Sequence, residues 1–564
     1  MLLRTLSDFM ARKAVGSRRR NEMRRGGSPG TSPRVMLALL LALPTLLLSG
    51  APRAWAATSA RAPAATADRA TPAASMRPNI VVILTDDLDA RTLAENLDRL
   101  PHVAALEKEG TTFSNFFVTT PECCPSRASI LRGQYAHNHG VLHNRGTPGE
   151  EGGFATFHRL DREDSTVATW LQAAGYRTVL LGKYLNGYPG DVDPTYRPAG
   201  WNEWYARVDQ KGEPFYFDYR LNENGKLVAY GHDPADYSTD VLSAKASSFI
   251  ERTADSGDPF FLYLAPFAPH NPATPAPRDA QAFDGLQAPR TPSFNETDVT
   301  DKPVWVRERH VLNADQVAQV DELFRERMRS LLAVDDMVGR TVEALRVSGA
   351  LDNTYIVFTS DNGFHLGEHR IAQGKLTPYD ESIKVPLVVR GPGVATGRVE
   401  DLMASNIDLA PTVAGLVGAA APDFVDGRSL VPLLRGSANV STWRRSILIE
   451  QFDPKSLRRG KDRHRDRATP EGSPTAGEVS EESDAGLRVP TYQALRTGNL
   501  LYVEYATGEK ELYDLAKDPY ELQNRATTAG PAVMRSLSGR LAELRDCVAV
   551  SCRSAEDSPL PVHG

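Results

Sequence analysis

The feature that most constrains this chain is a set of short, continuous apolar runs rich in β-branched residues. The first is Asn79 to Leu84, and similar runs recur at Thr178 to Leu181, Phe260 to Leu264, Tyr355 to Phe358 and Pro386 to Val389. Such runs are typical of strands buried on both faces of a parallel sheet. Helical patterns separate them, the clearest ending at Gly349. The alternation predicts an α/β sandwich around a large, mainly parallel sheet.

Acidic residues directly follow two of these apolar runs. Asp86 and Asp87 come after the first run, and Asp361 and Asn362 come after Tyr355 to Phe358. In open α/β sheets ligands bind at the carboxyl ends of strands, so we expect these four side chains to converge. One Asp-Asp pair is usually a solvated turn, but two pairs after buried strands favour a metal site. Its all-oxygen ligands suit Ca²⁺ or Mg²⁺.

The first 56 residues have the pattern of an export signal. A basic stretch precedes 14 apolar residues, Val35 to Leu48, and Ala54-Trp55-Ala56 provides a cleavage site. The apolar run is too short for a stable membrane anchor, although a retained anchor is the alternative. The pattern therefore predicts a secreted, extracellular or periplasmic protein, exported by a Sec signal or, given Ser17-Arg18-Arg19, a twin-arginine signal.

The net charge of the chain gives no overall attraction for an anionic partner. The chain has 65 basic and 71 acidic residues, and ten of the basic but only two of the acidic ones lie in residues 1–56, which leaves a net charge of −14 on the rest. We therefore expect no nucleic-acid partner, and the net charge gives no overall attraction for an anionic substrate.

The domain organisation follows from changes in composition. We expect a flexible spacer over 57–76, a catalytic domain over 77–436 and a C-terminal α+β subdomain over 437–552, with a tail over 553–564. Within the subdomain, 453–488 has a basic block followed by an acidic, Pro/Gly/Ser-rich block. We interpret it as a disordered, solvated insertion, with a polyanion-binding loop as the alternative.

The four cysteines fall into two pairs. Cys547 and Cys552 lie close together near the end of the chain, where a mutual disulfide is the simplest assignment. Cys123 and Cys124 have no obvious partners, although free thiols in an oxidising compartment need an explanation.

The sequence around Cys123 supplies that explanation by resemblance. Cys123-Cys124-Pro125-Ser126-Arg127, followed by Leu131-Arg132-Gly133, resembles the signature of type I sulfatases, and Gly175 to Lys183 resembles their second signature. The resemblance covers Arg77 to Gly436 and resumes at Tyr492 to Asn524. It implies an alkaline-phosphatase-like fold, with Cys123 oxidised to formylglycine (3-oxoalanine) by a formylglycine-generating enzyme during maturation.

The resemblance also implies roles for individual residues. Hydrated formylglycine 123 would be the nucleophile, bound to a divalent metal, Ca²⁺ or alternatively Mg²⁺. The implied metal ligands are Asp86, Asp87, residue 123, Asp361 and Asn362, and the implied catalytic residues are Cys123, Arg127, Lys183, His270 and Lys375. Arg127 would stabilise the nucleophile, the two lysines would bind sulfate, and His270 would protonate the leaving oxygen.

Within the family, four segments are most similar to N-acetylglucosamine-6-sulfatases. They are Cys123 to Arg127, His137 to Val141, Gly182 to Asn186 and Ser360 to Gly363. Many arylsulfatases have a histidine two residues after the lysine of the second signature, whereas this chain has Leu185 and then Asn186. The proton relay would then come from His139 or Asn186, and His365 and His369 are expected to contact substrate.

These observations predict a secreted sulfatase that acts on a sulfated small molecule or glycan, with the 6-O-sulfate of an N-acetylglucosamine-type sugar as the candidate. Two alternatives remain. One is a phosphodiester or phosphonate monoester hydrolase, because related folds use the same nucleophile on phosphorus. The other is a catalytically silent glycan-binding protein.

Overall fold

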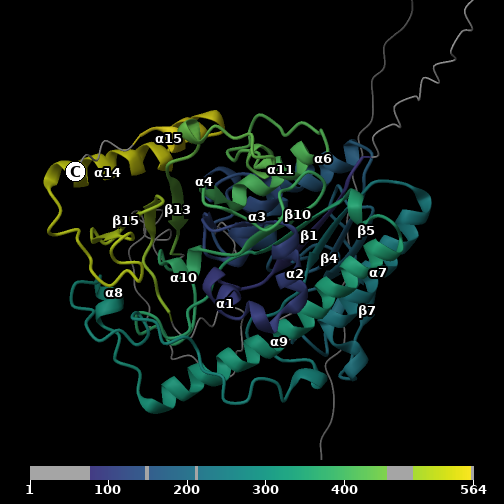
Figure 1. Cartoon of the computed structure of the whole chain (residues 1–564), viewed down its shortest axis with the longest axis horizontal. Helices are drawn as coiled ribbons and strands as arrows, with labels where there is room; N and C mark the ends of the chain where they lie inside the picture. Colours follow the sequence, from purple (N-terminus) through teal and green to yellow (C-terminus); the bar gives the residue numbers. More distant parts are fainter. Residues whose placement is uncertain (1–76, 146–151, 210–213, 454–486, 560–564) are drawn as a thin grey trace, which may run out of the picture. The chain divides into compact units, whose positions relative to one another are not determined.

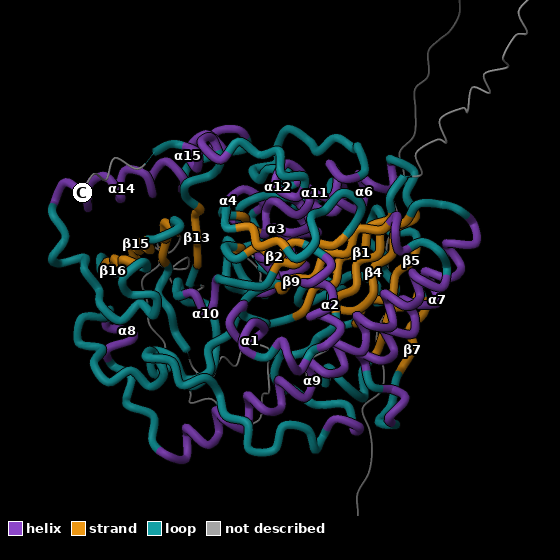
Figure 2. Tube along the Cα trace, viewed as in Figure 1, coloured by secondary structure: helices purple, strands orange, loops and turns teal. Residues whose placement is uncertain are grey.

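The structure, a computed structural model, describes residues 77–145, 152–209, 214–453 and 487–559. A ten-stranded sheet forms its centre, with the strand order β11-β2-β10-β9-β1-β8-β4-β5-β6-β7 (Figures 1 and 2). In that order the strands are Arg398–Glu400, Thr111–Phe113, Leu387–Arg390, Thr354–Ser360, Asn79–Thr85, Phe260–Ala265, Arg177–Gly182, Glu203–Arg207, Arg220–Glu223 and Lys226–Ala229.

Five neighbouring strands, β9-β1-β8-β4-β5, pair in parallel. Strand β10 runs antiparallel to β9 and β2. The chain leaves β9 at its carboxyl edge and enters β10 from the same edge, so β10 must run in the opposite direction. The prediction of a large, mainly parallel sheet is confirmed.

Strand β1 explains why its apolar run has no polar positions. Ile80 and Val82 belong to one buried apolar cluster, and Val81 and Ile83 belong to another on the opposite face of the sheet. Successive side chains in a strand point to opposite faces, so a strand covered on both sides is apolar throughout. Burying these branched side chains stabilises the fold by roughly 2 kcal/mol each.

Helices cover both faces of the sheet (Figures 1 and 2). The helices whose side chains pack in the Val81 cluster are α2 (Pro101–Glu109), α7 (Ser238–Ser256) and α9 (Ala314–Val347). Those that pack in the Ile80 cluster are α3 (Cys123–Arg132), α5 (Gly153–Arg159), α6 (Val167–Ala173), α11 (Leu409–Leu416) and α12 (Val431–Leu434).

The remaining helices and strands near the large sheet are short. They are α1 (Ala90–Glu95), α4 (Ala136–His139), α8 (Val304–Arg307), α10 (Asp380–Ile383) and the paired strands β3 (Phe116–Phe117) and β12 (Ala404–Ser405). Long helix α9 begins with a capping box in which the Asn313 side chain accepts from the Gln316 N–H.

A second, antiparallel sheet lies C-terminal to the large one. It consists of β13 (Ile447–Gln451), β14 (Tyr492–Arg496), β15 (Leu500–Tyr505) and β16 (Lys510–Asp514), followed by α14 (Pro531–Arg545) and α15 (Val550–Asp557). The predicted smaller C-terminal α+β unit is therefore confirmed as part of the fold class.

Residues 553–557 differ from the expected tail, because they form the second half of α15. The Glu556 carboxylate is fully buried and accepts from Arg444 Nε at 2.8 Å and from the Tyr135 hydroxyl at 2.6 Å. A buried, paired carboxylate cannot belong to a solvated tail.

Several predicted segments lie outside the described residues. They are the signal over 1–56, the spacer over 57–76 and nearly all of the insertion over 453–488. In the part of the chain that the structure describes, no helix is both long and apolar enough to cross a bilayer.

Candidate active site

The acidic residues that follow β1 and β9 meet at the carboxyl edge of the large sheet. These strands pair in parallel with Thr85 opposite Ser360, so the residues after them are adjacent. Asp361 Oδ1 accepts from the Asp87 N–H at 3.1 Å, and Asn362 Nδ2 donates to Asp87 Oδ1 at 2.6 Å. The sheet register thus brings the two acidic segments together.

Cys123 lies at the N-terminus of α3 and faces these carboxylates. Its Sγ is 3.5 Å from Asp86 Oδ1 and accepts from Lys375 Nζ at 2.8 Å. A helix N-terminus carries partial positive charge and favours anions near residue 123. Burial raises the pKa of the Cys123 thiol well above its usual value, although Lys183 and Lys375 act in the opposite direction. The unmodified thiol is therefore neutral and a poor nucleophile.

Three cationic side chains surround the carboxylates. Arg127 Nε donates to Asp361 Oδ2 at 2.7 Å, and its Nη2 lies 3.6 Å from Asp86 Oδ2. Lys183 Nζ donates to Asp86 Oδ2 at 2.6 Å, and Lys375 Nζ donates to Asp87 Oδ1 at 2.5 Å. The three cations and three carboxylates are thus paired with one another at this point of the sheet edge.

The cations decide the protonation of the carboxylates. Burial would raise the pKa of Asp86, but the charges of Lys183 and the other cations outweigh burial and lower it well below the usual value. For Asp361 burial prevails over the opposing effect of Arg127 and raises the pKa to about 6.

His270 completes the group from the loop after β8. Its Nε2 lies 3.7 Å from Asp87 Oδ2, and its Nδ1 contacts the Asn271 carbonyl oxygen at 2.5 Å. With Nδ1 donating to that carbonyl, Nε2 is the nitrogen directed at the carboxylates. Burial lowers the pKa of His270, although Asp86 and Asp87 partly offset the effect. We refer to the whole group as the strand-end cluster. Its members are Asp86, Asp87, Cys123, Arg127, Lys183, His270, Asp361, Asn362 and Lys375.

The donor atoms of the strand-end cluster fit a divalent cation. Asp86, Asp87, Cys123 and His270 offer ligand atoms that lie within 4.8 Å of one another. The Asn362 amide oxygen is buried without a hydrogen-bond partner, which is costly unless a ligand occupies the position. Carboxylate and amide oxygens suit a hard cation such as Ca²⁺ or Mg²⁺.

The structure places His139 and His365, a predicted relay residue and a predicted substrate contact, in the protein interior. His139 is fully buried, with Nε2 3.0 Å from Ser129 Oγ and Nδ1 accepting from the Val141 N–H. His365 is also fully buried, with Nε2 2.7 Å from Thr377 Oγ1. Both rings serve the interior, because their positions near motif residues in the sequence do not fix the direction of the side chains.

Asn186, the other predicted relay residue, lies beside the second cysteine. Its backbone forms a hydrogen bond with the Cys124 thiol, and its carbonyl oxygen accepts from the Phe154 N–H at 2.8 Å. Asn186 therefore supports the loop after Lys183 and the start of α5.

Arg327 in α9 is a site residue that the sequence analysis missed. Its fully buried guanidinium donates to the backbone carbonyls of Asp87 and Pro269, so it ties the acidic pair to the loop that carries His270. The signal was an arginine on the apolar face of a helix, three residues after Phe324 and four before Leu331.

A cavity of about 480 Å³ adjoins α9 and the loop that carries Lys375. Its lining includes Arg309, His310, Arg370 and Gln373, and Gln373 accepts from Asn271 Nδ2 at 3.3 Å. Apart from Leu487, its lining residues lie in 308–323 and 370–373. The basic lining suits an anionic sugar.

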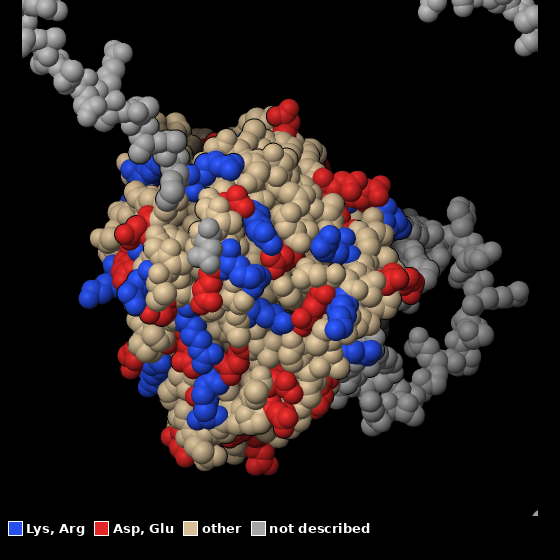
Figure 3. Space-filling view, turned by 90° about the vertical axis from the view of Figure 1, so that its right-hand side faces the viewer, with Lys and Arg blue, Asp and Glu red and all other residues tan. Residues whose placement is uncertain are grey.

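The surface charge of the protein does not attract an anionic substrate to one particular face. On the face shown in Figure 3, basic and acidic side chains intermingle without a large patch of one sign. At physiological ionic strength fields are largely screened beyond about 8 Å, so capture of an anion depends on the local cations.

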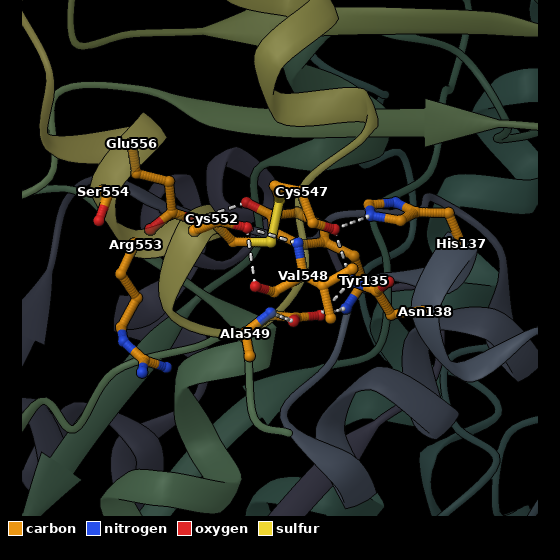
Figure 4. Close-up of a disulfide and its surroundings, with 12 residues drawn as sticks. Tyr135, His137, Asn138, Cys547, Val548, Ala549, Cys552, Arg553, Ser554 and Glu556 are labelled. Carbon is orange, nitrogen blue, oxygen red and sulfur yellow. Dashed lines mark hydrogen bonds between the residues drawn. A yellow bond between two sulfur atoms is a disulfide. The ribbon is translucent and has the colours of Figure 1, made fainter. Parts of the chain in front are cut away.

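Cys547 and Cys552 form a disulfide near Tyr135, His137 and Asn138 (Figure 4). The Cys547 carbonyl oxygen contacts His137 Nε2 at 3.0 Å and accepts from Asn138 Nδ2 at 3.1 Å. Because His137 and Asn138 belong to α4, the disulfide loop fastens the end of the chain to this short helix, which follows α3.

The fold and the site together define a hydrolase built on an α/β sandwich. It assembles acids, cations and one reactive side chain at the carboxyl edge of its sheet. The chain belongs to the sulfatase family, whose model matches residues 78–419. It is a sulfuric ester hydrolase, as the resemblance predicted. The family generally uses a formylglycine and a divalent metal.

Two sulfatase sequences and one solved structure are among the proteins that this chain is similar to. The chain is 36% identical over 500 residues to human N-acetylglucosamine-6-sulfatase, which covers 86% of this chain and 87% of that protein. It is 36% identical over 398 residues to a putative extracellular sulfatase Sulf-1 homolog of Caenorhabditis elegans, covering 68% of this chain and 54% of that protein. Its fold resembles that of BT4656, solved in complex with its substrate D-glucosamine-2-N, 6-O-disulfate, with a TM-score of 0.67 and 24% identity over 85% of this chain and 99% of that one.

Proposed function

We propose that this chain is an exported sulfatase that removes the 6-O-sulfate of N-acetylglucosamine-type sugars, with formylglycine formed from Cys123 as its nucleophile. The observation that carries the proposal is the position of residue 123. Its side chain lies between Asp86 and Lys375 at a helix N-terminus, in a site where an unmodified thiol is neutral. Conversion to a hydrated aldehyde would replace this poor nucleophile with a hydroxyl at the same point.

A divalent cation, which we expect to be Ca²⁺ with Mg²⁺ as the alternative, would be held by Asp86, Asp87, Asp361, Asn362 and residue 123. When bound, it supplies Lewis-acid polarisation of the sulfate and of the nucleophilic hydroxyl. The buried, unpartnered Asn362 oxygen supports this ligand set. We expect chelation to remove activity and Ca²⁺ to restore it.

The cationic side chains bind and orient the sulfate group. Lys183 and Lys375 are buried beside residue 123, so their charges act in a site with little water. Arg127 holds Asp361 and Asp86 in place through its planar guanidinium, a geometry that lysine cannot reproduce.

His270 donates a proton to the leaving sugar oxygen. Because Nδ1 is engaged with the Asn271 carbonyl, the proton must leave from Nε2 of the charged ring. Burial lowers the pKa of this ring, so the charged form is populated mainly in acid. We expect kcat to rise as the pH falls toward and below about 6.5, the ordinary histidine value. A profile that rises on the alkaline side would exclude His270 as the acid.

The glycan is expected to occupy the cavity beside α9. Arg309, His310 and Arg370 line it and would contact a further sulfate or a carboxylate of the sugar chain. The names of the relatives support an amino sugar carrying a 6-O-sulfate.

Parallel measurements of kcat/KM test this function. The substrates are N-acetylglucosamine 6-sulfate, its 3-sulfate and 4-sulfate isomers, and aryl sulfate, phosphodiester and phosphonate esters. We expect the highest value for the 6-sulfate sugar. Preference for the phosphorus esters would establish the alternative hydrolase, and sugar binding without turnover by protein with modified residue 123 would establish the silent binder.

Export and maturation complete the proposal. The signal over 1–56 would direct the chain out of the cytoplasm, in keeping with relatives named as extracellular sulfatases. A formylglycine-generating enzyme would act on the Cys123 segment before folding, because residue 123 is fully buried in the folded chain.

A further inference from the structure

A second group of buried ionisable side chains lies outside the strand-end cluster. It consists of His369 in the loop after β9, Glu381 in α10 and Glu521 in the segment between β16 and α14. Their exposed fractions are 0%, 8% and 1%, and their ligand atoms lie within 4.8 Å of one another. We call these three residues the His369 cluster. It joins the catalytic region to the C-terminal region of the chain.

Each side chain of the His369 cluster leaves one polar atom without a partner. His369 Nε2, Glu381 Oε2 and Glu521 Oε1 are buried and form no hydrogen bond. His369 Nε2 lies 3.9 Å from Glu381 Oε2. Three orphaned polar atoms at one point are unusual, because buried polar groups are almost always satisfied.

The other atom of each side chain is held by a neighbour. Glu381 Oε1 accepts from Ser293 Oγ at 3.4 Å, and Glu521 Oε2 accepts from the Asp380 N–H at 3.2 Å. These contacts fix the carboxylates so that their remaining oxygens are directed toward His369.

The imidazole has the orientation found at metal sites. His369 Nδ1 lies 2.8 Å from Glu296 Oε2, and the ring stacks on Tyr379 with centroids 4.2 Å apart. Histidines that bind metals commonly donate their other N–H to a carboxylate, which leaves the second nitrogen as the ligand. Glu296 in turn lies 3.3 Å from Lys302 Nζ.

Charge around the His369 cluster is only partly balanced, because Arg91 acts on Glu381 and Arg496 acts on Glu521 without forming ion pairs with them. Among the described residues, no lysine or arginine forms an ion pair with Glu381 or Glu521. Burial, followed by the nearby Glu368, raises the pKa of Glu381 to about 8. Burial, followed by Asp380, raises the pKa of Glu521 well above its usual value. Two buried carboxyl groups must therefore share protons or bind a cation.

We propose that His369 Nε2, Glu381 Oε2 and Glu521 Oε1 bind one Zn²⁺ ion, separate from the cation of the strand-end cluster. A ligand set with imidazole nitrogen suits zinc, whereas Ca²⁺ and Mg²⁺ prefer oxygen alone. Ligands about 2.0–2.1 Å from a tetrahedral zinc lie about 3.4 Å apart, so the His369–Glu381 pair must contract by about half an ångström from 3.9 Å, and ligand atoms as far apart as 4.8 Å must contract by about 1.4 Å.

The ion would hold the loop that carries Lys375. His369 and Glu381 flank this loop on either side, and Lys375 between them reaches Cys123 Sγ and Asp87 Oδ1. Glu521 attaches the same point to the C-terminal region. Zinc would thus be structural, fixing the position of one cation of the strand-end cluster without touching substrate.

Metal analysis of the full-length mature protein, purified with Zn²⁺ and Ca²⁺ present and then freed of loosely bound ions, tests the proposal. We expect about one zinc per chain, falling below about a tenth of an equivalent in Glu521→Gln and His369→Gln. X-ray absorption of the bound zinc should show one imidazole nitrogen with oxygen ligands.

Two controls make the result specific. Glu511→Gln changes a buried glutamate of the same region whose oxygens already accept from Tyr379, Tyr505 and Tyr513, so this variant should keep its zinc. Asp87→Asn should lose the strand-end cation and keep zinc.

A thermal measurement covers variants that fail to fold. Zn²⁺ added to metal-free wild-type protein should raise Tm by several degrees. In Asp87→Asn, which lacks the strand-end cation, added Ca²⁺ should give no such rise. Wild-type protein that holds no zinc and shows no Tm change with zinc would overturn the proposal in favour of shared protons. Zinc retained equally by Glu521→Gln would also overturn it.

Discussion

The strand-end cluster and the His369 cluster are both buried groups of ionisable side chains, and they differ in their cations. The strand-end cluster contains lysine and arginine side chains, whereas the His369 cluster contains neither. In the strand-end cluster, Lys183 and its neighbours keep the pKa of Asp86 well below the usual value. In the His369 cluster, burial and Glu368 raise the pKa of Glu381 to about 8. Buried carboxyl groups therefore have a lowered pKa in one place and a raised pKa in the other.

The difference teaches what each cluster can bind. The strand-end cluster carries protein cations alongside its carboxylates, so it can hold a metal ion and a sulfate group together. The His369 cluster offers only acceptors and one imidazole, so it suits a metal ion alone. Burial by itself does not define a functional site, because the neighbouring charges determine its chemistry.

Cys123→Ala gives the largest expected effect and acts on the strand-end cluster alone. We expect sulfatase kcat/KM to fall by roughly a thousandfold or more, since no other side chain replaces residue 123 as nucleophile. Cys124→Ala is the matched control and should keep most of the activity. A Cys123→Ala protein with a tenth of wild-type turnover would refute the nucleophile.

Lys375→Met removes a cation from the same cluster, and its contact with residue 123, while leaving residue 123 itself unchanged. We expect kcat to fall by roughly a hundredfold, because one charge that stabilises the transferring sulfate is lost. Lys384→Met, on the same segment but near the Phe117 ring, should remain active. Equal activity of the two variants in a steady-state assay would show that Lys375 has no part in catalysis.

Lys302→Met changes a residue beside the His369 cluster, where we expect a loss of stability and little effect on substrate binding. The buried Lys302 Nζ donates to the carbonyls of Glu521 and Leu522 and pairs with Glu296. Its removal should lower the free energy of unfolding by about 3 kcal/mol, with KM nearly unchanged. Lys510→Met, which breaks a partly exposed pair with Glu504, should cost under about 1 kcal/mol in the same denaturant titration. Comparable losses in both variants would contradict this contrast.

His137 gives a titration outside both clusters. Burial opposes its charge, but Glu450 prevails and raises the pKa to about 9. A raised folded-state pKa gives stability that is complete below the unfolded value of about 6.5 and is lost as the pH rises through about 9. The stabilisation amounts to about 3 kcal/mol at most.

The free energies of unfolding of wild type and His137→Gln at pH 6 and pH 10 measure this effect. We expect the wild type to be more stable by the larger margin at pH 6, with the margin shrinking at pH 10. A margin independent of pH would mean that the His137–Glu450 pair does not titrate in this range.

The sequence predicted the features that depend on local pattern. The β1 and β9 runs ending in Asp86-Asp87 and Asp361-Asn362 indicated both the sheet and the convergence of these acids, because parallel neighbours share an edge. The Lys183 and His270 positions followed from the family resemblance.

Features that depend on side-chain direction or distant contacts were not predictable from the sequence. His139 and His365 point into the interior, and Arg327 reaches the backbone of Asp87 from a helix 240 residues later. The His369 cluster depends on Glu521, which follows its partners by well over a hundred residues and carries no local signal. Tertiary packing, which local periodicity does not encode, places these residues.

Mass spectrometry of the tryptic peptide containing residue 123 tests the central claim most directly. The protein is produced together with a formylglycine-generating enzyme, and its sulfatase turnover is measured on the same sample. We predict the aldehyde, or its hydrate, at residue 123 in proportion to turnover. Full turnover by protein whose residue 123 is an unmodified cysteine would contradict the claim.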